Sequence, residues 1–158
     1  MTHSTYTDAL ALTIRALEQT RHLLTLAQKQ VKETDLTESA ILTAKLSPDM
    51  FDFTRQIQII SDNAKGIYAR YAGVTIPSMP DTESSLVELI ARIDATRAFV
   101  GDGLIRGEDA INETEITFAW MPGKKIMAHD YTVEFALPNL YFHMSMAYAI
   151  LRSHGIPV

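Results

Sequence analysis

The chain has 158 residues, of which 47% are hydrophobic and 21% are charged, and its formal net charge is −5. This composition is typical of one folded domain over residues 1–158, too apolar for a disordered chain and too charged for a membrane protein. The acidic balance argues against a nucleic-acid or anionic-membrane surface, and the lack of cysteine excludes disulfides, thiolate catalysis and thiolate zinc sites. No secretory signal or membrane span is recognisable, so we expect a cytoplasmic protein.

Four segments carry apolar residues at alternating spacings of three and four, which predicts an amphipathic helix in each. The predicted spans are 5–31, 48–72, 85–100 and 131–153. Because a one-sided apolar stripe must be buried against partners of the same kind, the sequence predicts an all-α four-helix bundle. The four stripes are Leu10, Ile14, Leu17, Leu24 and Val31; Met50, Phe53, Ile57, Ile60, Ala64, Ile67 and Tyr71; Leu86, Leu89, Ile93, Thr96 and Val100; and Val133, Leu137, Leu140, Met144, Ala147 and Leu151.

Residues with known preferences for helix ends mark the boundaries. Ser47 before a proline predicts the N-cap of the second helix, and Asp130 is expected to cap the last. Ser85 with Glu88 three positions later forms a predicted capping box for the third helix. Gly73 is placed where the second helix would end in a left-handed residue.

The connections between the helices differ in character. One or two helical turns are expected around residues 40–42, and residues 74–80 are expected to be extended because of their prolines. The connection at 101–129 is long for a bundle loop. It alternates polar and apolar residues over 115–120, has a predicted turn at 121–123, and continues over 124–129, which predicts a β-hairpin anchored by Phe118 and Trp120.

Two groups of strings resemble a known family. The first group is the sequence at 47–51, 55–58, 62–66 and 72–73, and the second, more specific group is Ala-Leu-Pro-Asn-Leu-Tyr-Phe-His at 136–143 with the sequence at 147–152. These strings resemble an uncharacterised bacterial family, known only as a domain of unknown function and placed in the DinB-like superfamily. The resemblance covers nearly the whole chain. It implies a DinB-like four-helix bundle and a family in which dimers are common.

The superfamily resemblance also implies a possible metal. Many DinB-like proteins bind a divalent metal through three histidines, one near the start of the second helix and two on the last helix, four residues apart. His143 could be one such ligand, but the residues four positions away are Ala147 and Asn139, and the second helix begins with Asp52 and Gln56 rather than a histidine. The three-histidine site is therefore absent, and His143 is the only ligand that carries over.

Polar residues on the second and the last predicted helices predict a small pocket between them. His143 and Asn139 lie one turn apart in a stretch that is otherwise apolar, so they are expected inside the bundle. Asp52 and Gln56 follow helical spacing on the second helix, and together the four side chains would form a ligand-binding site. Pro138 is expected to kink the last helix and widen the bundle beside Asn139.

Each of these groups also has a structural interpretation. A buried histidine can simply fix the register of two helices, and the Asp52 face can be a solvated flank. Asp62 and Lys65, three positions apart, are interpreted as a surface ion pair.

The functional prediction is a small-molecule-binding bundle, with catalytic residues and cofactor unknown. The alternatives are a divergent metal-dependent hydrolase or transferase, and a purely structural or interaction protein. The last helix carries tyrosine, phenylalanine and methionine beyond one stripe, which predicts a homodimer contact.

Overall fold

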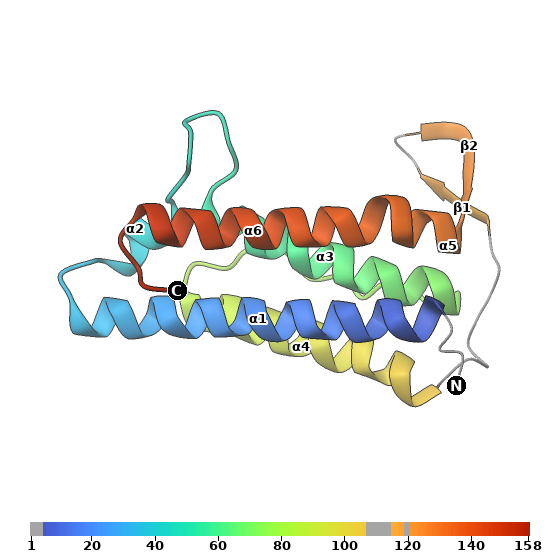
Figure 1. Ribbon diagram of the computed structural model, residues 1–158, viewed down its shortest axis with the longest axis horizontal. Helices are drawn as coiled ribbons and strands as arrows, with labels where there is room; N and C mark the ends of the chain where they lie inside the picture. The colour runs from blue at the N-terminus through green and yellow to red at the C-terminus, as the bar shows by residue number, and fades with distance from the viewer. Residues whose placement is uncertain (1–4, 107–114, 119–120) are drawn as a thin grey trace.

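The computed structural model describes residues 5–106, 115–118 and 121–158. Four long helices lie side by side (Figure 1), which confirms the predicted all-α bundle: α1 (Thr5–Glu33), α3 (Phe53–Ala72), α4 (Leu86–Arg106) and α6 (Leu137–Ser153). The shorter elements are α2 (Glu38–Leu42), strands β1 (Glu115–Phe118) and β2 (Met121–Met127), α5 (Ala128–Asp130) and the π-helix η2 (Tyr131–Ala136). Within the described ranges, none of the helices has the length and apolarity needed to span a membrane.

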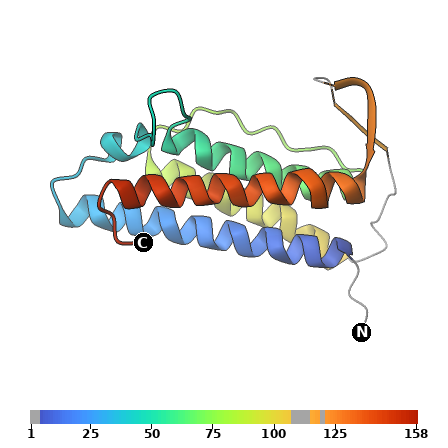
Figure 2. The same cartoon turned by 45° about the horizontal axis from the view of Figure 1, so that its top comes forward.

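The helix directions require one long crossover. Helices α3 and α4 run in the same direction, opposite to α1 and α6 (Figures 1 and 2). Residues 74–85, here called the crossover, therefore return along the length of α3. An extended chain of this length reaches about 40 Å, and the 20 residues of α3 span about 30 Å. The predicted extended conformation of residues 74–80 is thus what permits a parallel α3–α4 pair.

The predicted apolar stripes form most of the core. All five stripe residues of α4 are fully buried, as are Leu10, Leu17 and Leu24 of α1 and the α3 stripe from Phe53 to Ile67, whereas Ile14 is partly buried. Val133 is an exception, because 45% of its surface is exposed. It lies in η2, whose wider turn shifts the helical phase, so Tyr131, Thr132 and Ala136 face inward instead. The prediction that Val133 belongs to the core was therefore wrong.

Two predicted helix starts were also wrong. Helix α3 begins at Phe53 rather than at 48, and its N-cap is Asp52, whose Oδ1 accepts a hydrogen bond from the Arg55 amide at 2.8 Å. Ser47 instead donates to the Asp49 carboxylate at 2.5 Å. Asp130 makes no capping hydrogen bond, because α5, η2 and α6 continue one into the next.

Other boundary signals were confirmed. The Ser85 hydroxyl accepts from the Glu88 amide at 3.2 Å, while the Glu88 carboxylate turns to Ser84. Gly73 ends α3 with φ of 63°, which is the left-handed conformation expected of a C-cap glycine. Helix α4 continues past the predicted end at residue 100 to Arg106.

A β-hairpin is present in the third connection, but its turn is not the predicted one. The strands are antiparallel and Phe118 pairs with Met121, so residues 121–123 belong to β2. The Phe118 ring lies 5.4 Å from the Tyr131 ring and under the Arg70 guanidinium. The hairpin therefore packs near the C-terminal end of α3, where Arg70 lies. Trp120, the other expected anchor, lies outside the described residues.

Candidate functional site

The site begins with a hydrogen bond between α6 and the first turns of α3. His143 is buried, and its Nδ1 lies 2.7 Å from Oε1 of Gln56. The Gln56 amide nitrogen donates to the Phe51 carbonyl at 3.3 Å, just before α3. The structure thus brings together two of the four predicted site residues, His143 and Gln56.

The same arrangement repeats two turns further along α3. Asn139 donates from Nδ2 to Oδ1 of Asn63 at 3.2 Å, and Asn63 donates its own Nδ2 to the Ile59 carbonyl at 3.0 Å. In both cases the side-chain amide nitrogen on α3 donates to a backbone carbonyl, that of Ile59 within α3 or that of Phe51 in the loop before it. Helix α3 therefore presents two side-chain oxygens to α6, and the groups on α6 must be donors.

This pattern fixes the protonation of the imidazole. Since Oε1 of Gln56 can only accept, His143 carries its hydrogen on Nδ1, and the neutral ring leaves Nε2 as an acceptor. Burial, together with the nearby Arg55 guanidinium, lowers the pKa of His143 below its ordinary value of 6.5. At neutral pH the ring is therefore an uncharged base.

A small cavity lies next to this ring. It has a volume of about 260 Å³ and is lined by Asp49, Met50, Phe51, Gln56, Phe142, His143 and Met146. The walls are mostly sulfur and aromatic carbon. No hydrogen-bond partner for Nε2 of His143 is found among the described residues, and His143 lines this cavity together with one other ionisable residue, Asp49.

The remaining predicted residues have other places. Asp52 caps α3 and lines a separate cavity of about 460 Å³ with Glu38 and Glu83, and no contact joins it to His143. Asn139 is half-buried and bonded to Asn63, outside the lining of the His143 cavity. Pro138 stands in the first turn of α6 directly after η2, where a proline is tolerated, and the kink expected there stays a prediction.

The described residues do not fit a divalent-metal centre. No group of three or more histidine, cysteine, aspartate or glutamate side chains converges anywhere in the part of the chain that the structure covers. Next to His143 stands the amide of Gln56, and the Asp52 carboxylate is used by the Arg55 amide. A protein zinc site needs at least three ligands, so this donor set is insufficient.

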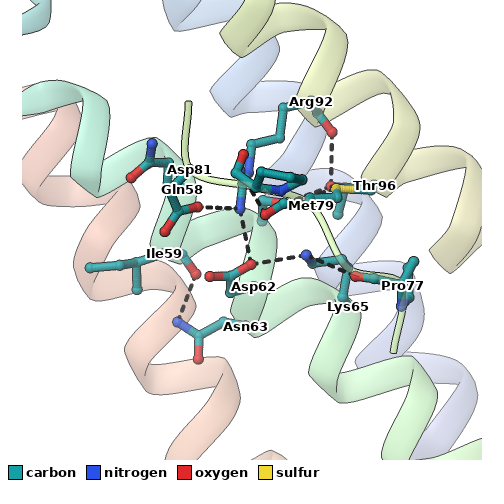
Figure 3. Close-up of polar contacts among 12 residues, drawn as sticks. Gln58, Ile59, Asp62, Asn63, Lys65, Pro77, Met79, Asp81, Arg92 and Thr96 are labelled. Carbon is teal, nitrogen blue, oxygen red and sulfur yellow. Dashed lines mark hydrogen bonds and ion pairs between the residues drawn. The ribbon is translucent and has the colours of Figure 1, made fainter. Parts of the chain in front are cut away.

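A second polar cluster lies beneath the crossover (Figure 3). The Arg92 side chain is 2% exposed and forms ion pairs with Asp62, Asp81 and Glu83 at 3.1, 3.0 and 2.8 Å. It also donates to the carbonyls of Met79 and Pro80, at 3.5 and 3.2 Å. One α4 arginine thus holds both the side chains and the backbone of the crossover.

Lys65 belongs to this cluster. Its side chain is 3% exposed, and Nζ contacts Asp62 at 2.9 Å and the Pro77 carbonyl at 3.3 Å. The predicted ion pair between Asp62 and Lys65 is present, but Lys65 does not lie on the surface, because the crossover covers it. Helical spacing could not predict the burial of Lys65, because it depends on the crossover, which packs against the helix from outside.

The charges of the cluster are balanced. Arg55, Lys65 and Arg92 oppose Asp62, Asp81 and Glu83. Burial would raise the pKa of Glu83, but hydrogen bonds from Arg92 and Gln58 outweigh burial and lower it. Although a cavity of about 380 Å³ adjoins Arg92, its charged groups are already paired. The cluster therefore fastens the crossover and offers no free charge to a ligand.

The apolar half of the His143 cavity was not predicted from the sequence. Phe51 and Phe142 were noted only for the family resemblance and the dimer surface, yet they line the cavity with Met50 and Met146. The available signal was the position of Met146, three residues after His143 on the same helical face. The loop residues Met50 and Phe51 were assigned to a helix and so could not be placed.

Comparison with known proteins agrees with the architecture. The family described as "Domain of unknown function (DUF1993)" matches residues 5–158. The crystal structure of a DinB family member protein from Shewanella denitrificans is similar, with a TM-score of 0.86 and 28% sequence identity. The match covers 96% of this chain and 87% of that chain. No curated protein matches the chain. The DinB-like bundle expected from the sequence strings is confirmed.

Proposed function

The chain belongs to the DUF1993 family, and because that description assigns no activity, we propose from the site itself that the protein binds a small molecule in the His143 cavity. The observation that carries the proposal is the unused Nε2 of a neutral, immobilised imidazole at the wall of an apolar cavity. A few well-placed polar atoms in an otherwise apolar hollow are typical of ligand sites. The volume of about 260 Å³ limits the ligand to the size of a metabolite fragment.

Two of the three larger cavities among the described residues are lined by charged groups and give less support to ligand binding, and the third lies between α1 and α6 beside Tyr148. The charged groups of the cavity beside Arg92 are the Glu83–Arg92 ion pair and Glu88, whose carboxylate accepts from Ser84. The cavity beside Asp52 is lined by carboxylates that cap helices or form ion pairs. A ligand there would have to break existing interactions. A ligand in the His143 cavity would instead supply the hydrogen bond that Nε2 of His143 lacks.

The methionines provide the test. Methyl-13C-methionine spectra would be recorded while small fragments are added, with Met50 and Met146 reporting on the cavity and Met79 reporting on the crossover. We expect at least one fragment to shift the Met50 and Met146 signals and leave Met79 unchanged. Fragments would be used up to about 10 mM, because a Kd near 1 mM corresponds to only about 4 kcal/mol.

A cavity-filling variant is the control. Met146→Trp should abolish the shift of the remaining Met50 signal by occupying the cavity, whereas Met144→Trp, in a separate groove between α1 and α6, should not. The proposal fails if no fragment from a chemically diverse set perturbs Met50 and Met146 in the folded wild-type protein.

A homodimer is a second proposal, supported by a different observation. Helix α6 leaves Phe142 and Tyr148 more than two-fifths exposed, and Phe135 in η2 is similarly exposed. Exposed large apolar side chains on one helix are typical of a contact between two copies. Light scattering should give twice the chain mass for the wild type and a lower mass for Phe142→Ser. A cytoplasmic location remains an expectation from the sequence, which cell fractionation would test.

A further inference from the structure

The hydrogen-bond roles around the cavity define what its ligand must offer. Gln56 accepts from Nδ1 of His143 because its own nitrogen is held by the Phe51 carbonyl. Rotating the Gln56 amide would leave that carbonyl without its donor and place an N–H group against the ring. Nε2 is therefore held as an acceptor, and a ligand must bring a donor to it.

The charges near the His143 ring disfavour a cationic donor there, and the Asp49 carboxylate disfavours an anionic ligand group. The Arg55 guanidinium lies close enough to oppose positive charge on His143. Asp49, in the cavity lining, is held as a carboxylate by its hydrogen bond from Ser47, which lowers its pKa. A cationic donor placed at Nε2 of His143 would be opposed by Arg55, and an anionic ligand group placed beside Asp49 would be repelled by that carboxylate.

The walls suit a flat apolar body. Phe51 and Phe142 supply aromatic surface, and Met50 and Met146 supply polarisable thioethers, which make favourable contacts with aromatic rings. Methionine side chains also adapt to irregular shapes. An aromatic ring of one or two fused cycles matches this lining better than a sugar or a phosphate does.

We propose that the ligand class of this cavity is an uncharged aromatic molecule with one O–H or N–H donor, a phenol or an indole in chemical type, whose donor binds Nε2 of His143. This inference rests on the proposed function and specifies the chemistry of the same site. The aromatic ring lies against the methionine and phenylalanine walls, and the donor completes the imidazole's hydrogen bonding.

Four matched probes separate this inference from the proposed function. Phenol, anisole, benzoate and benzylammonium would be titrated into the wild-type protein, with Met50 and Met146 signals as the readout. We expect phenol to bind about tenfold or more tightly than anisole, which lacks the donor. Anisole equal to phenol, or a charged probe that binds more tightly, overturns the donor inference while leaving a ligand cavity. Absence of binding by all four overturns the inference itself, whereas the proposed function is decided by the wider fragment set.

A substitution at Gln56 reverses the expected preference. Gln56→Glu puts a carboxylate against Nδ1, favours the imidazolium, and makes Nε2 a donor. Phenol affinity should then fall and benzoate affinity rise, each by about tenfold. Asn63→Asp, which adds the same charge beside Asn139 instead, should keep the wild-type order.

The protonation state of the ring would be read directly. Nitrogen-15 histidine spectra report whether His143 is neutral in the wild type and charged in Gln56→Glu. A phenol preference that persists although the ring is charged would overturn the inference. Should Gln56→Glu not fold, the wild-type comparison of phenol with anisole decides the question.

Discussion

Nδ1 of His143 lies 2.7 Å from Oε1 of Gln56, a residue 87 positions earlier in the chain. This one contact orients the imidazole, selects its tautomer and joins α6 to the start of α3. It also turns the other ring nitrogen into the unused acceptor of a small cavity. A structural role in fixing helix register and a ligand-binding role are therefore compatible in the same residue.

The first prediction concerns pH. The pKa of His143 is below 6.5 in the folded protein, so below that pH the unfolded chain takes up a proton that the folded chain refuses. This residue's destabilising effect should be absent above about pH 7 and should grow as the pH falls below 6.5. Each unit of separation between the two pKa values contributes up to about 1.4 kcal/mol.

The measurement is urea unfolding between pH 5 and pH 8. Stability of the wild type should decrease toward pH 5 more steeply than stability of His143→Gln, which cannot be protonated there. His22, exposed on α1, is the matched control, and His22→Gln should follow the wild-type curve. Parallel curves for wild type and His143→Gln would contradict the prediction.

The second prediction concerns the cluster beneath the crossover. Arg92→Met removes the cation from Glu83, whose side chain is 10% exposed, and from the more exposed Asp81, and should lower the free energy of unfolding by about 2–4 kcal/mol. The crossover should also become sensitive to limited proteolysis. Arg97→Met breaks only the exposed pair with Glu18 and should cost at most about 1 kcal/mol. Equal losses for the two variants would show that the cluster does not fasten the crossover.

The third prediction tests the corrected start of α3. Asp52→Ala should lower the free energy of unfolding by about 0.5–2 kcal/mol, because the Arg55 amide loses its capping oxygen. Asp49→Ala, in the loop before the helix, should leave stability close to that of the wild type. If Asp52→Ala also weakens phenol binding strongly without unfolding the protein, Asp52 has a ligand role that the structure does not indicate.

The fourth prediction compares two glycines on α4. A Cβ at Gly103 would lie 2.6 Å from the buried Tyr68 ring and 2.8 Å from Leu10, so Gly103→Ala should cost about 1–3 kcal/mol. A Cβ at Gly101 meets nothing within 4 Å, and Gly101→Ala should stabilise the helix by up to about 1 kcal/mol. Thermal unfolding of both variants would test this: Gly103→Ala should unfold at a lower temperature than the wild type, and Gly101→Ala at a higher one.

Local pattern was a good guide where one helix face meets the core over its whole length. The stripe Leu86, Leu89, Ile93, Thr96 and Val100 is fully buried as predicted, and Ser85 and Gly73 act at helix ends as their chemistry requires. The pattern failed at Val133, because a π-helix inserts a change of phase that a regular repeat cannot anticipate.

The candidate site was predictable in part. An isolated histidine in an apolar helix has to find a buried partner, so the sequence by itself determined that His143 would lie inside a bundle. It also determined the absence of thiol chemistry and of a three-histidine metal site, because those depend only on residue type and spacing.

Only the tertiary structure decided which polar groups meet. The rotation of α3 against α6 chose Gln56 and Asn63 rather than Asp52 as partners, and the parallel course of α3 and α4 carried the crossover over Lys65 and Arg92. Helical spacing specifies a face but not the neighbour that the face will contact. That neighbour is selected by packing between segments far apart in the chain, where no local repeat carries the information.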